Sequence, residues 1–156
     1  VKQFDKVQQY IKTGIEEGAT LLTGGLGKPE GLKEGNFVKA TIFTNVRNAM
    51  TIAREEIFGP VLCIIPYQTE AEAIEIANDT PYGLAAYCYA QNLTEIHRVS
   101  VGLDYGNVAI NNVDAGIMNA AYGGRKQSGF GYEHGREGLL EYFNFKHIRL
   151  HHGVEN

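Results

Sequence analysis

The chain has 156 residues, 44% of them hydrophobic and 21% charged, the composition of a soluble globular protein with one compact core. Its 14 basic and 18 acidic residues give a net charge of −4, which argues against a nucleic-acid partner because such partners demand a basic face. No apolar run reaches the roughly 18 residues of a membrane span, and no signal peptide opens the chain. Two cysteines, Cys63 and Cys88, form no disulfide framework. We therefore expect a cytoplasmic protein without a membrane partner.

The first residues predict a helix. Phe4, Val7, Ile11 and Ile15 are spaced by three, four and four, which places them on one helix face, and Gly18 can end the helix. The sequence starts inside this helix without a methionine, which favours a chain cut from something larger over a merely trimmed terminus.

A glycine-rich loop over residues 24–35 follows a short apolar run. No helix follows its glycines, so the loop is not a phosphate cradle. Residues 37–44 are rich in β-branched and aromatic side chains and predict a strand. Residues 45–54 predict a connection with one helical turn.

From residue 61 the pattern becomes regular. The apolar runs 61–66 and 84–90 predict strands buried on both faces, and a third strand is predicted over 107–112. Between them lie two helices, one opened by the capping-box pair Thr69 and Glu72 and one with Ile96, Val99 and Leu103 on its inner face. This β-α-β-α-β alternation predicts an α/β fold with a parallel sheet, whose working loops lie beyond the carboxyl ends of the strands.

The last third of the chain changes character. Residues 114–132 predict a long irregular glycine-rich loop, and loops of this length tend to be functional. A helix is predicted over 137–143 and a final strand over 145–150. That strand has no pairing partner nearby in the sequence, and an open edge needs one. We therefore expect the protein to be a homo-oligomer.

Several motifs occur together in a recognisable order. They read EEIFGPV at 55–61, PYGLA at 81–85, NVAIN at 107–111, YGGRKQSG at 122–129, and EY at 141–142 with Lys146. Taken together, from about residue 3 to residue 150, they resemble the NAD(P)-dependent aldehyde dehydrogenase superfamily, and the first matches its E-E-x-F-G-P-V motif position by position. The resemblance rests on all of these motifs together, since a single one is weak evidence for a family.

The resemblance implies a cofactor site for NAD or NADP. Glu56 is implied to accept hydrogen bonds from the two hydroxyls of the nicotinamide ribose, a role that suits a carboxylate. Phe58 is implied to offer a flat apolar surface near the nicotinamide ring. Gln3 and Lys6 are implied to reach the same ribose. Residue type alone favours simpler interpretations. Glu56 would be a solvated loop carboxylate and Phe58 a core aromatic. Gln3 and Lys6 would be solvated residues on a helix surface.

The resemblance also implies a binding site for an aldehyde substrate. Asn111 ends a buried strand at the expected mouth of the site, although it could be an ordinary turn former. Tyr122 stands where the family has a phenylalanine at the aldehyde entrance, which favours a more polar substrate. Gly116 replaces an aromatic and would widen the pocket. Tyr132 replaces a common arginine, so no role is carried onto it.

The nucleophilic cysteine of the family is absent. It stands in a G-Q-x-C context upstream of every motif found here, whereas Cys63 and Cys88 lie in apolar strands, where burial makes a thiol inert. We therefore predict no catalytic residue in this chain and no dehydrogenase activity of the isolated chain. The histidines His147, His151 and His152 lack ligand spacing, so no metal site is expected.

The sequence thus predicts a three-layer α/β fold, with residues 1–144 as the C-terminal part of the aldehyde dehydrogenase catalytic domain and 145–156 as an oligomerisation strand and tail. The parent enzyme would oxidise an aldehyde to a carboxylate, with the rest of the same chain as partner. Two alternatives remain open, a non-catalytic assembly or binding module and a coenzyme A-acylating relative.

Overall fold

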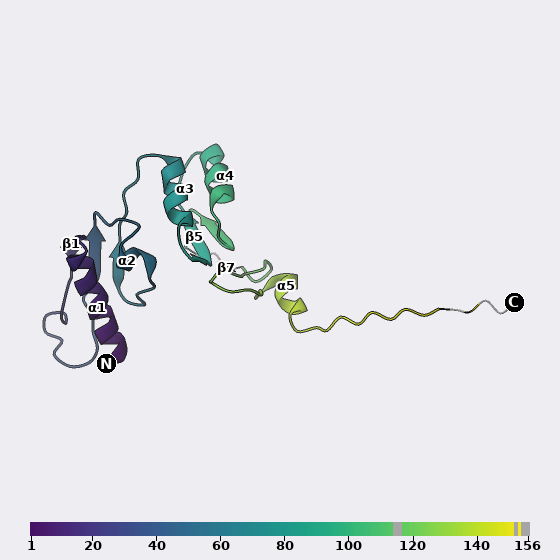
Figure 1. The fold of residues 1–156 in the computed structure, drawn as a ribbon, viewed down its shortest axis with the longest axis horizontal. Helices are drawn as coiled ribbons and strands as arrows, with labels where there is room; N and C mark the ends of the chain where they lie inside the picture. The colour runs from purple at the N-terminus through teal and green to yellow at the C-terminus, as the bar shows by residue number, and fades with distance from the viewer. Residues whose placement is uncertain (114–116, 152, 154–156) are drawn as a thin grey trace. The chain divides into compact units, whose positions relative to one another are not determined.

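The computed structural model describes residues 1–113, 117–151 and 153, and Figure 1 shows the order of the elements. The chain divides into two compact units, Val1–Thr80 and Pro81–Asn156. Both combine helices with short strands, and each contains one parallel strand pair. The predicted α/β class is confirmed, whereas the predicted boundary at 144/145 stays a prediction.

Helix α1 (Lys2–Glu16) opens the first unit as predicted, and it is followed by Gly18 with a positive φ of 89°. Its buried face differs in one position from the predicted one. Val7, Ile11 and Gly14 are buried, but Ile15 is 42% exposed. A Cβ at residue 14 would lie 2.8 Å from Cδ1 of Ile52. Gly14 therefore faces the core, because the side chain of Ile52 in α2 (Thr51–Arg54) comes close to the helix at this position.

The first unit contains a three-stranded sheet in the order β1-β2-β3. Strand β1 (Thr20–Thr23) is antiparallel to β2 (Thr41–Thr44) and carries an irregularity in register, and β3 (Val61–Cys63) is parallel to β2. The strand predicted over 37–44 is confirmed only for its last four residues. The prediction that the strand from residue 61 is buried on both faces was wrong for this chain, because Leu62 is 56% exposed.

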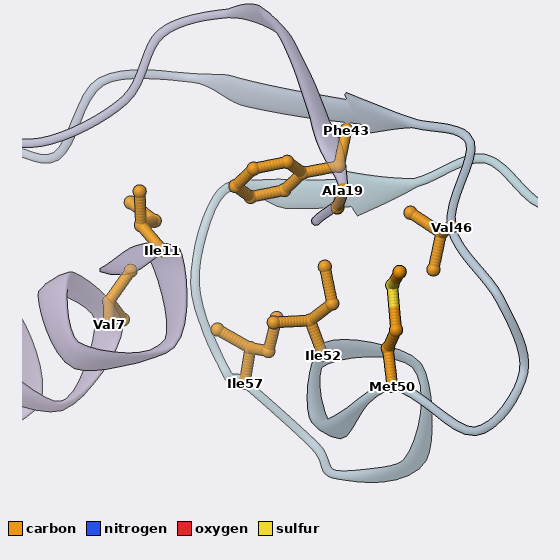
Figure 2. Packing of buried hydrophobic residues seen from close by; sticks show 8 residues of the cluster. All are labelled: Val7, Ile11, Ala19, Phe43, Val46, Met50, Ile52 and Ile57. Carbon is orange, nitrogen blue, oxygen red and sulfur yellow. The ribbon is translucent and has the colours of Figure 1, made fainter. Parts of the chain in front are cut away.

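The hydrophobic core of the first unit lies between the sheet and the helices. Figure 2 shows side chains from α1, β2 and the segment around α2 converging on the ring of Phe43, which is fully buried. The cluster consists of Val7, Ile11, Ala19, Phe43, Val46, Met50, Ile52 and Ile57. This core fixes the segment that leads from α2 to β3, because Ile57 is one of its members.

Helix α3 (Glu70–Asn78) ends the first unit and begins with the predicted capping box. The backbone N–H of Glu72 donates to Oγ1 of Thr69 at 3.1 Å, and the Glu72 carboxylate accepts from the backbone N–H of Gln68 at 2.7 Å. The carboxylate therefore bonds one residue earlier than in the standard motif, where it would reach the capping residue itself.

The second unit is built around the parallel pair of β5 (Ala85–Cys88) and β6 (Asn107–Ile110), connected by α4 (Leu93–Gly102). This confirms the predicted β-α-β unit. The predicted strand from residue 61 pairs instead with β2, in a different sheet. A short antiparallel pair joins β4 (Tyr82–Gly83) to β7 (Arg125–Lys126), and α5 (Gly135–Leu140) follows.

Residues 145–150 follow α5 as exposed chain. Among the described residues they join no ladder, and Phe145, Ile148 and Leu150 are 87%, 69% and 81% exposed. The strand predicted there is not formed within the single chain, because a strand needs a second strand to which its backbone can hydrogen-bond. None of the helices described is long and apolar enough to cross a membrane.

Candidate functional site

The four predicted cofactor residues come together in the first unit. Gln3 and Lys6 lie on one face of α1, and Glu56 and Phe58 lie on the segment that joins α2 to β3. The Gln3 amide nitrogen Nε2 donates to the carbonyl oxygens of Ile57 at 3.2 Å and Phe58 at 2.8 Å. The Lys6 ammonium donates to the carbonyl oxygen of Glu56 at 3.4 Å. Two side chains of α1 thus hold three consecutive carbonyl groups.

The backbone of Phe58 has an unusual conformation. Its φ is +54°, in the left-handed region, which costs a residue with a Cβ about 1 to 2 kcal/mol. The ring is 72% exposed, so burial of the ring does not stabilise this conformation. The two hydrogen bonds from Gln3 hold the carbonyl groups on both sides of the Phe58 nitrogen and α-carbon.

Gly59 allows the segment to lie directly on α1. A Cβ at this position would lie 2.6 Å from Cγ2 of Val7, a core residue that is 2% exposed. Any larger residue would push the segment away from the helix. The glycine of the motif is therefore explained by close packing, and its φ is not in the left-handed region.

The Phe58 ring borders a recess of about 400 Å³. Residues from the start of α1, from the loop before β2 and from the motif line it, namely Val1, Gln3, Phe4, Val7, Asn36, Phe37, Val38, Phe58, Gly59 and Pro60. The recess is mostly apolar, and Gln3 brings a polar group to it. An aromatic ring beside an apolar recess is suited to a flat ligand.

The two adjacent glutamates of the motif have different surroundings. The phenol of Tyr10 donates to Oε2 of Glu55 at 2.7 Å. The Glu56 side chain is exposed, and no described residue forms a hydrogen bond or ion pair with its carboxylate. Glu55 thus has one carboxylate oxygen bonded within the chain, whereas both oxygens of Glu56 can accept hydrogen bonds from a ligand.

Asn111 lies in the second unit, one residue after β6. Its Oδ1 accepts from the backbone N–H of Ala90 at 3.0 Å, and its Nδ2 donates to the carbonyl of Ala90 at 2.8 Å. The backbone N–H of Asn111 donates to the carbonyl oxygen of Cys88 at 2.8 Å. The side chain thus imitates one more step of strand pairing at the carboxyl ends of β5 and β6, with φ at 51°. Substrate contact by Asn111 stays a prediction.

Tyr122 begins a loop that is more ordered than the sequence suggested. It forms an isolated antiparallel bridge with Glu133, with both backbone hydrogen bonds at 2.8 Å. The Ser128 hydroxyl accepts from the backbone N–H of Gly83 at 3.0 Å, and β7 pairs with β4. The prediction of a wholly irregular loop was wrong for its second half. The predicted pocket widening at Gly116 lies outside the described residues.

A second recess, of about 410 Å³, lies within this unit. Tyr122, Leu84, the loop of residues 123–124 and 128–133, and Glu141 line it. Tyr122 therefore borders a cavity, as the sequence predicted for a substrate residue, although its role stays a prediction. Tyr132 lies on the same wall and is 51% exposed.

Asn107 is a residue that the sequence analysis missed. Its buried side chain donates to the carbonyl oxygens of Leu84 at 2.9 Å and Gly123 at 3.0 Å. It thereby joins the start of the β5 strand to the loop that carries Tyr122. The signal was present, because a polar residue at the start of a buried strand must find partners.

Neither cysteine resembles an activated nucleophile. The thiol of Cys63 donates to the carbonyl of Ile52 at 3.4 Å, and burial raises the pKa of this thiol. Cys88 lies within β5. Both are partly rather than fully buried, which corrects the expectation of deep burial. Among the described residues no group of three potential metal ligands occurs.

A family model for the aldehyde dehydrogenase family matches residues 1–148. The chain belongs to the aldehyde dehydrogenase family. A Staphylococcus saprophyticus protein whose name assigns it to the aldehyde dehydrogenases is 54% identical over 148 residues, which are 94% of this chain and 31% of that protein. The chain thus spans about a third of the length of the curated relatives it matches.

Solved structures of aldehyde dehydrogenases agree with this assignment. A mutant of aldehyde dehydrogenase C from Pseudomonas syringae, in complex with NAD+ and octanal, is 45% identical with a TM-score of 0.87, over 91% of this chain and 29% of that one. A Mycobacterium tuberculosis aldehyde dehydrogenase in complex with NAD+ is 48% identical with a TM-score of 0.84, over 90% and 29%.

Proposed function

We propose that the chain is the C-terminal part of an NAD(P)-dependent aldehyde dehydrogenase that oxidises an aldehyde to a carboxylate. Within that enzyme, residues 55–60 bind the nicotinamide ribose. The observation that carries this proposal is the contrast between two exposed glutamates, because Tyr10 bonds one oxygen of the Glu55 carboxylate while no described residue bonds the Glu56 carboxylate. Solved relatives that are 45% and 48% identical contain NAD+.

The residues of the first unit fit a dinucleotide. A carboxylate accepts a charge-assisted hydrogen bond from each of two adjacent hydroxyls, so Glu56 would orient the ribose. The exposed Phe58 ring would cover one face of the nicotinamide beside its recess. Bound NAD(P)+ supplies a hydride acceptor to the reaction. The protein's contribution here is to hold that acceptor in a fixed position and to exclude water from one side of it.

The aldehyde would be held by the second unit. Asn111 and Tyr122 are the proposed substrate residues, and the phenol of Tyr122 favours an aldehyde that carries a polar group. Equal turnover of hydroxylated and plain aldehydes of the same length would contradict this preference.

The isolated chain should have no dehydrogenase activity. The proposed enzyme needs a thiolate nucleophile, and Cys63 is hydrogen-bonded with a raised pKa. Purified residues 1–156 should therefore show no NAD(P)-dependent aldehyde oxidation, whereas the complete polypeptide should. Cofactor-dependent turnover by the 156-residue chain would overturn this expectation.

We also propose that residues 145–150 pair as a strand with a second copy of the complete enzyme. The segment is exposed, including the large apolar side chains of Phe145, Ile148 and Leu150, and among the described residues it pairs with no strand. Removing the segment should lower the sedimentation coefficient of the complete enzyme to that of a smaller assembly. An unchanged coefficient would contradict the proposal.

The test of the cofactor site is Glu56→Gln in the complete polypeptide. Replacing a charged acceptor by a neutral amide removes a charge-assisted interaction of about 1.5 to 3 kcal/mol, so the Kd for NAD(P)+ should rise by roughly tenfold or more. Glu55→Gln is the matched control, since that carboxylate is already bonded to Tyr10 and should leave the Kd nearly unchanged. An unaltered Kd in Glu56→Gln would refute the proposed site.

A further inference from the structure

We propose that Gln3 is a positioning residue, which sets the geometry of the cofactor segment through its backbone without touching the cofactor. This inference rests on the proposed function of residues 55–60. It departs from the expectation that the Gln3 side chain reaches the ribose, because its amide NH2 group bonds protein carbonyl groups and cannot also donate to the ribose. A side-chain NH2 group has two hydrogens, and these two bonds use both.

The segment of residues 55–60 needs a support from outside itself. Phe58 stands in the left-handed region with φ at +54°, a conformation that a bulky aromatic residue rarely adopts. Its ring is exposed and Glu56 is exposed, so neither side chain anchors the segment. The anchors are Ile57, which is buried in the core, and Gly59, which lies against Val7.

Gln3 bonds the stretch of backbone between Ile57 and Gly59. The two carbonyl groups it holds belong to residues 57 and 58 and therefore bracket the φ and ψ rotations of Phe58. If the amide is lost, the peptide groups beside Phe58 can rotate toward the ordinary right-handed or extended regions. That rotation would redirect the Phe58 ring away from the recess, while Glu56 stays in place because Ile57 is anchored in the core.

Gln3 also borders the recess beside Phe58, but it contributes nothing to the core of the first unit. It is exposed on α1. A change at Gln3 should therefore leave the fold intact. It should weaken cofactor binding and affect the chemical step less, since the reacting groups lie elsewhere in the complete enzyme.

The experiment compares Gln3→Met, Gln3→Lys and Phe58→Gly in the complete enzyme, alone and combined. Gln3→Met keeps the length of the side chain and removes the donor, so the KM for NAD(P)+ should rise about fivefold to tenfold, as expected for two lost hydrogen bonds, while kcat changes less. Gln3→Lys retains a donor that can reach the same carbonyl groups and should restore most of the affinity.

The combination with Phe58→Gly decides between positioning and direct contact. Glycine adopts a positive φ without strain, so residue 58 no longer needs the support. In the Phe58→Gly background, Gln3→Met should raise the KM by less than about twofold. The same fivefold to tenfold rise in both backgrounds would show that Gln3 acts independently of Phe58, and it would overturn the inference.

The outcome is separable from that of the proposed function. If Glu56→Gln leaves cofactor binding unchanged, the cofactor site itself is misplaced. If Glu56→Gln weakens cofactor binding but Gln3→Met does not, the site stands and the positioning role is refuted. The same conclusion holds if the effects of Gln3→Met and Phe58→Gly on the KM are additive in free energy. Thermal unfolding of each variant checks that the fold is retained.

Discussion

The hydroxyl of Tyr10 lies 2.7 Å from Oε2 of Glu55, whereas no described residue bonds the carboxylate of the adjacent Glu56. The Lys6 ammonium lies 5.5 Å from the centre of the same tyrosine ring. Gln3, Lys6 and Tyr10 therefore form one row on α1 that engages the segment from residue 55 to residue 58. The helix acts as a fixed edge against which the cofactor segment is aligned.

Tyr10→Phe should destabilise the protein slightly without harming the proposed cofactor site. The bond joins exposed groups, so its loss should lower the free energy of unfolding by about 0.5 to 1 kcal/mol. The KM for NAD(P)+ should change by less than about twofold, because Glu56 keeps its surroundings. Urea unfolding and steady-state kinetics of the complete enzyme measure the two effects. A larger rise in KM than in Glu56→Gln would contradict the division of roles.

Gly59→Ala should be among the more damaging small changes in the first unit. The added methyl group would lie 2.6 Å from Cγ2 of Val7, which is buried and cannot move freely. We expect a loss of about 1 to 3 kcal/mol in the free energy of unfolding, together with weaker cofactor binding. Gly153→Ala is the matched control, since nothing lies within 4 Å of its added methyl group.

The same clash offers an internal check. Val7→Ala alone should destabilise the core, but in combination with Gly59→Ala it removes the methyl groups that collide. The double variant should therefore be more stable than the sum of the two single losses predicts. Strict additivity in chemical unfolding would show that Val7 is not the residue that requires glycine at position 59.

Asn107→Ala should loosen the loop that carries Tyr122. The change leaves the carbonyl of Gly123 without the bond from the Asn107 amide and removes one of the bonds to Leu84. Loss of buried hydrogen bonds of this kind should cost about 1 to 3 kcal/mol. Asn144→Ala, at an exposed position after α5, should stay within about 0.5 kcal/mol. Urea unfolding compares the two, and equal stabilities would refute the structural role of Asn107.

Cys63 should react slowly with alkylating reagents in the folded protein. Burial raises the pKa of this thiol, so less thiolate is present at a given pH. The sign for stability follows, because a pKa raised on folding favours the folded state fully below the pKa of the unfolded thiol, and this contribution is lost as the pH rises toward the folded pKa. Iodoacetamide labelling of Cys88→Ser at about pH 8.5, with and without urea, measures it. Equal rates in both conditions would contradict the prediction.

Local patterns predicted much of the fold because their signals lie within a few residues. Helix α1 and the capping pair Thr69 and Glu72 are of this kind. The parallel pairing of β5 with β6 was instead predicted from the alternation of strands and helices along the chain. The inner face of α1 was predicted less well. Spacings of three and four residues both fit a helix, so position 14 and position 15 compete, and only the approach of Ile52 decides between them.

The sequence proposes residues for the site but does not give their contacts. The motif names Glu56 and Phe58, yet nothing in the sequence says that Gln3 would bond to Phe58, which is 55 positions away. The left-handed backbone conformation of Phe58 could not be predicted from the sequence either, because aromatic residues favour other conformations. Such features depend on tertiary packing, which no local pattern records.

The bond between Gln3 and Phe58 also constrains when the cofactor segment takes its shape during folding. It closes 55 residues of chain, and the entropy lost in closing a loop rises with the logarithm of its length. Contacts so distant in sequence form only after nearer ones have shortened the chain. The observed conformation of residues 55–60 should therefore appear together with the Phe43 core, and the proposed cofactor site cannot form during synthesis until residue 58 has been made and packed.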